Sequence, residues 1–219
     1  MSTPALCCRD LEVRRASGFV LRVPELALGA GTTTAICGAN GSGKSTLLLA
    51  CAGLIDLSGG AIETDGALYH QGKAPAPSDM RRRVVLVTQD PYLLRGSVSR
   101  NLGWGLRLRR VPRSEQRGRI SEVLGALGIT ALAEQEAASL SGGQRTLVAV
   151  ARALVLRPAL LLLDEVTRDL DREHRAAVVE AIKKSSVGGA AVMLATHDQG
   201  IVDELGASRI ELNDGEIEG

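Results

Sequence analysis

Residues 38–45 have the composition of a phosphate-binding loop. Gly38-Ala39-Asn40-Gly41-Ser42-Gly43-Lys44-Ser45, with Thr46 next, fits G-x-x-x-x-G-K-[ST] between an apolar run at Thr34–Cys37 and a helical pattern at Thr46–Ala52. Glycines let the backbone wrap closely around an anion with its N–H groups turned inward. We therefore expect this segment to bind nucleotide phosphates, with Lys44 reaching the β- and γ-phosphates and Ser45 ligating Mg²⁺.

A second candidate lies where the apolar run Leu160–Leu163 ends in two adjacent carboxylates, Asp164 and Glu165. Charged groups at the end of a buried strand need a functional reason. In P-loop nucleotide hydrolases, an acidic residue at such a strand end holds the hydrated magnesium, a role that suits Asp164. Glu165 is placed to polarise the attacking water as a general base.

A third candidate is a second glycine-fronted helix start. Leu140-Ser141-Gly142-Gly143-Gln144 precedes a helical run, Gln144–Leu156, that ends before Pro158. The N-terminus of a helix carries positive potential and unpaired N–H groups, so it binds anions by the same physics as the first loop.

The elements that must position these residues follow from the hydrophobic pattern. Short apolar runs alternate with helical patterns, which predicts an α/β fold with a mostly parallel sheet and crossover helices. The expected strands, each apolar enough for burial on both faces, are Thr34–Cys37, Val84–Thr88, Ala159–Asp164 and Ala190–Thr196.

Ser114 and Asp171 are expected to cap helices, and Asn213-Asp214-Gly215 predicts a hairpin turn. The segment 95–140 is expected to be helical throughout, an inserted basic subdomain that follows an N-terminal antiparallel β region.

Composition narrows the class of protein. With 219 residues, 45% hydrophobic and 23% charged, the chain can form a sizeable core, and a net charge of +1 gives no reason to expect nucleic acid as a partner. Mean hydropathy is +0.09, but the longest apolar stretch, 47–55, is too short to span a bilayer. No secretory signal is visible in residues 1–10, which favours the cytoplasm, and the four cysteines are expected to be buried free thiols.

Six motifs in order resemble those of the ATP-binding-cassette (ABC) ATPases, the nucleotide-binding subunits of ABC transporters. Besides the three segments above, Gln89 in Val87–Pro91 resembles the Q-loop, Asp171 the D-loop, and His197 in Ala195–Asp198 the switch histidine. The resemblance covers essentially the whole chain. It implies a P-loop fold of ABC type in one domain, 1–219, with an ATP-binding core at 1–94 and 141–219 and a helical subdomain at 95–140.

The resemblance also implies roles. Gln89 would contact magnesium or the attacking water and link the helical subdomain to the site, and His197 would hold the γ-phosphate and orient the water. Ser141, Gly142, Gly143 and Gln144 would grip the ATP of a second subunit, so two chains, identical or paralogous, would sandwich two ATPs.

Several positions depart from the family pattern. Val166 replaces an expected proline and Arg168-Asp169 an expected small pair, which leaves the D-loop geometry open. The adenine-stacking position is occupied by Arg15, with Phe19 as the alternative if the loop is shifted.

The resulting expectation is an ATPase that powers a separate membrane permease from the inner face of the cell membrane. Residues 96–109 resemble the corresponding segment of importer ATPases more than that of exporters, which favours import over export. A soluble ABC-type ATPase that does not act in transport is the alternative, and a P-loop kinase or GTPase is disfavoured because Asn-Lys-x-Asp is absent. The sequence does not encode the transported solute.

Overall fold

The computed structural model describes residues 3–74 and 77–218, so the ends of the expected domain 1–219 and residues 75–76 lie outside the described residues. The strands are β1 Leu6–Arg14, β2 Val20–Leu28, β3 Thr33–Cys37, β4 Gly59–Thr64, β5 Ala67–His70, β6 Val84–Val87, β7 Leu160–Asp164, β8 Ala191–Ala195, β9 Ser208–Asn213 and β10 Glu216–Glu218. The helices are α1 Lys44–Cys51, α2 Ser78–Arg81, α3 Val98–Leu108, α4 Arg113–Ala126, α5 Gly142–Leu154, α6 Arg172–Val187 and α7 Gln199–Leu205, with 3₁₀ turns at Thr130–Leu132 and Ala137–Ser139.

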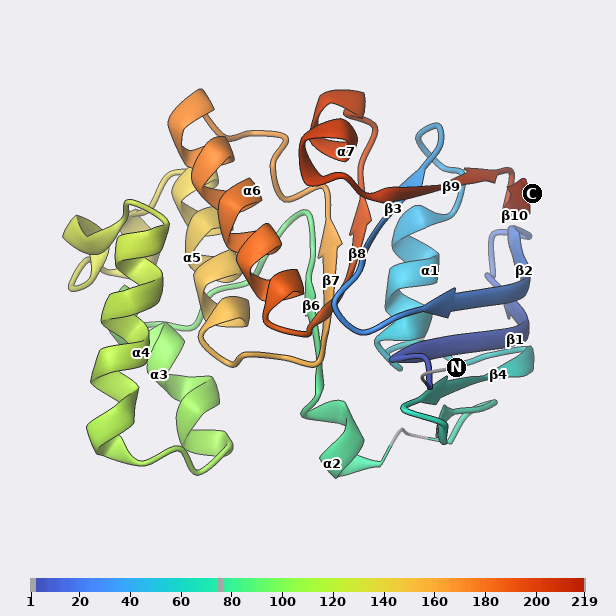
Figure 1. Ribbon diagram of the computed structural model, residues 1–219, viewed down its shortest axis with the longest axis horizontal. Coiled ribbons are helices and arrows are strands. Elements are labelled where there is room, and N and C mark those ends of the chain that lie inside the picture. The colour runs from blue at the N-terminus through green and yellow to red at the C-terminus, as the bar shows by residue number, and fades with distance from the viewer. Residues whose placement is uncertain (1–2, 75–76, 219) are drawn as a thin grey trace.

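The strands form one curled sheet with two differently built halves (Figure 1). Its order is β5-β4-β1-β2-β10-β9-β3-β8-β7-β6. Strands β9, β3, β8, β7 and β6 pair in parallel, whereas β2, β1, β4 and β5 pair antiparallel. The short strand β10 joins the halves, antiparallel to β9 and parallel to β2. The predicted α/β class, with a parallel core and an N-terminal antiparallel region, is confirmed.

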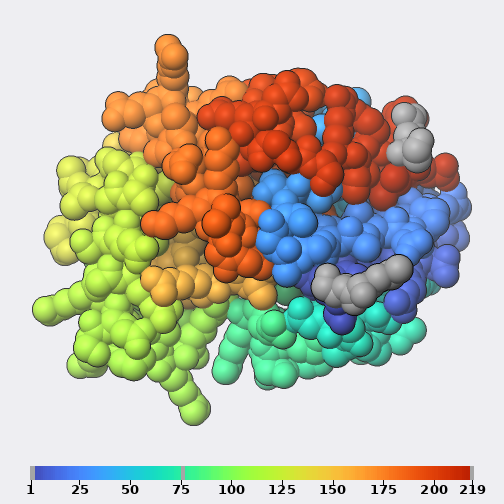
Figure 2. All heavy atoms as spheres, in the orientation of Figure 1, coloured from blue at the N-terminus to red at the C-terminus, as the bar shows by residue number. Residues whose placement is uncertain are grey.

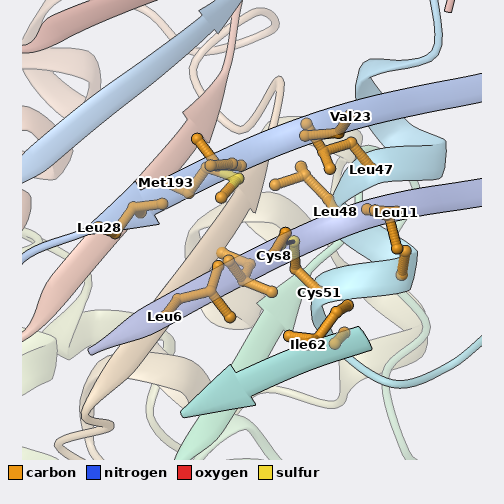
Figure 3. Packing of buried hydrophobic residues seen from close by; sticks show 14 of the residues in the cluster. Leu6, Cys8, Leu11, Val23, Leu28, Leu47, Leu48, Cys51, Ile62 and Met193 are labelled. Carbon is orange, nitrogen blue, oxygen red and sulfur yellow. Dashed lines mark hydrogen bonds between the residues drawn. The ribbon is translucent and has the colours of Figure 1, made fainter. Parts of the chain in front are cut away.

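The central parallel strands are buried on both faces, as their apolar sequences predicted. Along β7, Leu160 and Leu162 join one hydrophobic core, while Leu161 and Leu163 join the other. Successive side chains of a strand point to opposite faces, so an uninterrupted leucine run serves two cores at once. The first core lies between the sheet halves around α1; Figure 3 shows Leu47, Leu48 and Cys51 packed on strand residues that include Leu6, Cys8 and Met193.

The second core lies under α3, α4, α5 and α6. In Figures 1 and 2 the green and yellow helical segment lies at one end of the molecule and the blue antiparallel strands at the other. The expectation that 95–140 is helical throughout is wrong in detail, because loops separate α3, α4 and the two 3₁₀ turns. The cap predicted at Ser114 is also wrong: Pro112 takes the N-cap position of α4, since its fixed φ already suits a helix start.

Other local predictions are confirmed. Asp171 caps α6 by accepting a hydrogen bond from the His174 N–H, and β9 and β10 form the expected hairpin. Its turn places Asp214 at φ 44° and Gly215 at φ 87°, the positive values that a two-residue hairpin turn requires. All four cysteines are buried and free. No helix within 3–74 and 77–218 is long and apolar enough to cross a membrane.

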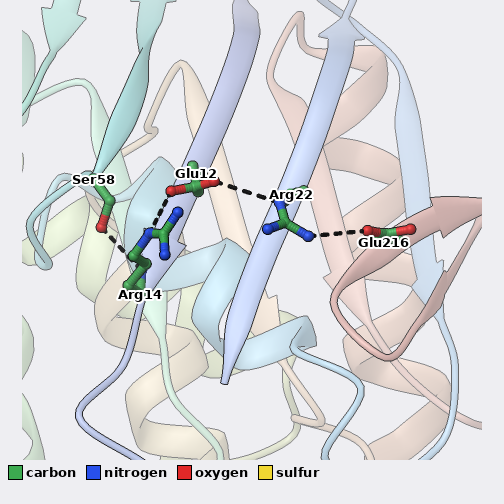
Figure 4. A network of polar contacts seen from close by, with 5 residues as sticks. All are labelled: Glu12, Arg14, Arg22, Ser58 and Glu216. Atoms are coloured by element: carbon green, nitrogen blue, oxygen red, sulfur yellow. Dashed lines mark hydrogen bonds and ion pairs between the residues drawn. The ribbon is translucent and has the colours of Figure 1, made fainter. Parts of the chain in front are cut away.

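A polar network lies on the outer surface where the hairpin meets the N-terminal strands (Figure 4). The Glu12 carboxylate accepts hydrogen bonds from Arg14 at 2.6 Å and Arg22 at 3.4 Å, and Arg22 also pairs with Glu216 at 3.4 Å. The hydrogen bond from Arg14 lowers the pKa of Glu12. Exposed ion pairs contribute little stability. These ion pairs link neighbouring strands, β1 to β2 and β2 to β10.

Candidate nucleotide site

The loop at residues 38–43 connects the carboxyl end of β3 to α1. Two of its glycines occupy positions where a side chain would collide with neighbouring atoms. Gly38 has φ 142°, and a Cβ there would lie 2.1 Å from the Leu212 carbonyl oxygen; Gly43 has φ 111°, and a Cβ there would lie 2.8 Å from Cζ of Phe19. The loop's shape therefore depends on glycine at these two positions.

The loop curls around the Lys44 ammonium group. Its Nζ donates hydrogen bonds to the carbonyl oxygens of Gly38, at 2.8 Å, and Ala39, at 2.9 Å. The side chain is almost fully buried. Helix α1 begins after Gly43, whose left-handed backbone supplies no side-chain cap. Positive charge from the lysine and from the helix N-terminus is thus concentrated inside one loop.

Asp164 is the last residue of β7 and lies next to Ser45 and Lys44 of this loop. The residue is buried, and its Oδ1 atom has no hydrogen-bond partner among the described residues. Burial raises the pKa of this carboxyl, opposed by the neighbouring Ser45 hydroxyl. A buried carboxylate oxygen without a partner, next to a serine hydroxyl, is a donor set that suits a hard cation such as Mg²⁺. The residues present therefore fit the expected magnesium ion.

Glu165 and His197 form a direct pair. Strands β7 and β8 are neighbours with Asp164 opposite Ala195, so the residues just beyond their carboxyl ends meet. Glu165 has φ 49°, its N–H donates to the Ala195 carbonyl at 3.0 Å, and its Oε2 lies 2.9 Å from His197 Nδ1. The Glu165 side chain is 7% exposed and that of His197 56%. The pair thus presents a shielded carboxylate with an accessible imidazole at its side.

A pocket of about 560 Å³ lies at this loop. Its lining consists of Arg15, Ser17, Phe19, Asn40, Gly41, Gly43, Lys44, Ser45, Thr46, Gln89, Glu165 and Arg168. Half of the predicted site residues are in this lining. Four more are outside it but contact residues of the lining: Gly38, Ala39, Asp164 and His197. Ser42 is buried beneath the loop, with its Oγ atom unpaired within the described structure.

Two residues of the lining were not predicted as site residues. Ser17 lies between Arg15 and Phe19 and carried no motif signal. The only feature of the sequence that pointed to Arg168 was its departure from the family pattern, which has a small residue at this position. Both alternatives for adenine stacking line the pocket: Arg15 is exposed, while Phe19 is half-buried against the first core and Gly43.

The predicted anion-binding turn at Ser141–Gln144 lies outside this lining. Ser141 is the N-cap of α5: its side chain accepts from the Gln144 N–H at 3.3 Å, and the Gln144 side chain accepts from the Ser141 N–H at 3.0 Å. The helix begins at Gly142, two residues earlier than expected. Gly143 packs against the D-loop, since a Cβ there would lie 3.1 Å from the Asp169 carbonyl oxygen. The turn at Ser141–Gln144, which we call the signature turn, and the pocket are thus separate features of one chain.

A second hollow, of about 480 Å³, follows the chain after Gln89. It is lined by Asp90, Pro91, Tyr92, Leu93, Leu94, Arg95, Ala137, Ala138 and Arg145. Two helices hold its edge: Asn101 of α3 donates to the Leu94 carbonyl at 2.9 Å, and Arg152 of α5 donates to the Tyr92 carbonyl at 2.9 Å. Tyr92 is 75% exposed, whereas Leu93 packs on the second core. We call this hollow the Tyr92 groove.

Comparison with known proteins agrees with this geometry. Residues 21–168 match the family model described as "ABC transporter". The chain is 40% identical over 197 residues to the Fe(3+) ions import ATP-binding protein FbpC of Streptomyces coelicolor, covering 88% of this chain and 55% of FbpC. It is 37% identical to the phosphate import ATP-binding protein PstB 2 of Natronomonas pharaonis, covering 90% and 73%. The chain thus spans only about half the length of FbpC.

Solved structures show the same fold. CbiO1 from Clostridium perfringens, described as part of the ABC transporter complex CbiONQ, superposes with a TM-score of 0.82 at 29% identity, covering 99% of this chain and 88% of CbiO1. Another structure, an ATP-binding subunit of an ABC transporter, superposes with a TM-score of 0.89 at 24% identity, covering 98% and 88%. The family match over most of the chain, with relatives above 30% identity, shows that this protein belongs to the ABC transporter family.

Proposed function

We propose that the chain is the ATP-binding and ATP-hydrolysing subunit of an ABC transporter that powers a separate membrane permease, in solute import. The observation that carries the ATPase assignment is the contact of His197 with Glu165, which lines the loop pocket. A shielded carboxylate beside a phosphate-binding loop can accept a proton from a water that attacks the terminal phosphate. Relatives named as import ATP-binding proteins support the direction of transport.

The proposed mechanism assigns one task to each group. The loop's N–H groups and Lys44 bind the ATP phosphates. Ser45 and Asp164, with Gln89 nearby, would hold Mg²⁺, which when bound offsets the phosphate charge. Glu165 takes the proton from the attacking water. His197 orients the Glu165 carboxylate through Nδ1 and remains exposed enough to contact the terminal phosphate.

We propose a second ATPase subunit, identical or paralogous, as one partner. Ser141, Gly142, Gly143 and Gln144 lie outside the chain's own pocket and at the surface, so any nucleotide they contact is held by another chain. We also propose the division into a core, 1–94 and 141–219, and a helical subdomain, 95–140, which α3 and α4 of the second core support.

The permease is the other proposed partner, and it would bind in the Tyr92 groove from the inner face of the membrane. Arg152 ties the groove's Tyr92 to α5, the helix that begins at the signature turn, and Gln89 lies just before the groove. Tyr92→Asp should release the chain from membranes while its ATPase in solution persists. The control is Leu108→Asp, which charges an exposed leucine outside the groove.

A soluble ABC-type ATPase that is not coupled to transport is the alternative function. Full recovery of the native chain in the soluble fraction of its own cells, bound to nucleic acid or ribosomes, would favour this alternative. The ATPase assignment would stand in either case.

The decisive test of Glu165 as the general base is Glu165→Gln. This variant keeps the size of the side chain but cannot accept the proton, so ATP binding should persist while turnover falls about 100-fold or more. Glu173→Gln, an exposed acid in the first turn of α6, is the control. Turnover at the native rate in Glu165→Gln would overturn the assignment of the general base.

A further inference from the structure

We propose that Arg168 is an additional phosphate-binding residue of this site, whose guanidinium contacts the terminal phosphate of the nucleotide held by its own chain. The inference rests on the proposed nucleotide site and adds a residue that the loop and acid motifs do not contain. It accounts for a long cation in the pocket lining beside Glu165 and Gln89.

The backbone that carries Arg168 is fixed in place. Val166 and Thr167, which link it to Glu165, are 1% and 4% exposed. The Arg168 N–H donates to the Glu165 carbonyl at 3.2 Å, and the Leu170 N–H approaches the Thr167 carbonyl at 3.5 Å. A tight turn anchored by two buried side chains therefore holds the Arg168 Cα beside the pocket, while its side chain remains exposed.

The guanidinium has no partner within the described part of the chain: no ion pair, side-chain hydrogen bond or ring contact involves it. By contrast, the nearby Arg175 is paired with Asp198 at 2.7 Å. Since an arginine stays charged at every physiological pH, the lining contains a cation that no acid of the chain neutralises. An anionic ligand in the pocket would supply the missing partner.

The strand order of the sheet indicates which part of the ligand Arg168 meets. Of the lining residues, Arg15, Ser17 and Phe19 come from the β1–β2 turn, on one side of β3. The loop and Lys44 follow β3 itself, and Gln89, Glu165 and Arg168 follow β6 and β7, on the other side of β3. A nucleotide whose β-phosphate lies on the loop places its base on the Arg15 side and its terminal phosphate on the Glu165 side. Arginine's planar fork is well suited to bind phosphate oxygens there.

The contact should distinguish ATP from ADP, because only ATP extends to Arg168. In calorimetric titrations of the full chain with Mg²⁺, Arg168→Ala should weaken binding of the non-hydrolysable β,γ-imido analogue of ATP about tenfold and binding of ADP less than twofold. Arg168→Lys should restore part of the loss. The control is Arg172→Ala, an exposed arginine four residues later that lies outside the lining and should change neither affinity.

One result would overturn the inference: an unchanged ratio of the two affinities in Arg168→Ala, whether both affinities fall equally or neither changes. The melting temperature of each variant verifies folding, since both arginines are exposed and neither packs in a core. If the native chain binds neither nucleotide, the proposed function fails together with this inference. If it binds both and only the ratio is unchanged, the inference on Arg168 alone fails.

Discussion

Two helices of this molecule begin with glycine-rich turns, and the turns are built in opposite ways. Helix α1 begins after Gly43, which has no side chain to cap the free N–H groups. Helix α5 begins with Ser141 and Gln144, whose side chains and N–H groups satisfy each other in a capping box. From sequence alone both turns were expected to bind anions by the same physics.

The difference is that, within the described structure, the α1 turn leaves buried side-chain atoms without partners and the α5 turn does not. The two buried side-chain atoms without hydrogen bonds in the described structure, Ser42 Oγ and Asp164 Oδ1, lie in or beside the α1 loop. A buried polar atom without a partner costs about 1–3 kcal/mol, and a ligand that supplies the partner recovers that free energy. The α1 turn is thus organised for a ligand of its own chain, whereas the α5 turn is capped by its own side chains and lies at the surface.

The largest expected difference concerns glycine in the two turns. Gly38→Ala places a Cβ 2.1 Å from the Leu212 carbonyl oxygen at a φ of 142°, so it should lower the free energy of unfolding by at least about 3 kcal/mol and abolish nucleotide binding. In Gly142→Ala nothing lies within 4 Å of the added methyl, and stability should change by less than about 0.5 kcal/mol. Urea unfolding of the two variants measures both values.

Equal losses in the two glycine variants would contradict the comparison, since the turns would then be under the same steric constraint. Gly41→Ala gives a second control inside the loop. Its Cβ meets nothing within 4 Å, although its φ of 86° still imposes backbone strain, so its loss should lie between the other two.

A smaller effect is expected from Asp164. Burial raises the pKa of this carboxyl above its ordinary value, so the charged form disfavours folding, and stability from this group falls as pH rises through the interval between the two values. Asp164→Asn should therefore raise the melting temperature of the nucleotide-free chain by about 2–4 °C at pH 7 while it removes the Mg²⁺ dependence of ATP binding. Differential scanning calorimetry at pH 4 and pH 7 should show a smaller gain at pH 4.

A lower melting temperature in Asp164→Asn at pH 7 would show instead that the carboxylate stabilises the empty loop. The α1 turn would then be stable without a ligand, as the α5 turn is, and the proposed contrast between the two turns would fail.

The smallest expected effect is at the α5 cap. Ser141→Ala removes the side chain that accepts from the Gln144 N–H, so it should lower the free energy of unfolding by about 0.5–1 kcal/mol without changing nucleotide affinity in the isolated chain. Ser141→Asp, which can still cap, should preserve stability. Weaker ATP binding in the monomeric Ser141→Ala chain would mean that the turn acts on its own chain's nucleotide.

Much of this protein is determined by sequence, because the informative patterns are local. The run Leu160–Leu163 predicts a strand buried on both faces, since no polar side chain interrupts it. Glycine, lysine and serine at fixed spacing predict the loop after β3, because the glycines allow a tight turn around phosphates and the lysine and serine open the following helix. The turn at Asp214-Gly215 and the Asp171 cap follow from residues that bond to their own neighbours.

Tertiary structure decided what depends on residues far apart in the chain. The pairing of β7 with β8 places Glu165 beside His197, a contact between residues 165 and 197 that no local pattern contains. The fold buries Asp164 Oδ1 without a partner in the described structure, and the turn after Glu165 places Arg168 in the pocket lining. The two glycine-fronted turns differ for the same reason: spacing specifies which groups a turn contains, whereas the surrounding fold determines which of those groups remain unsatisfied.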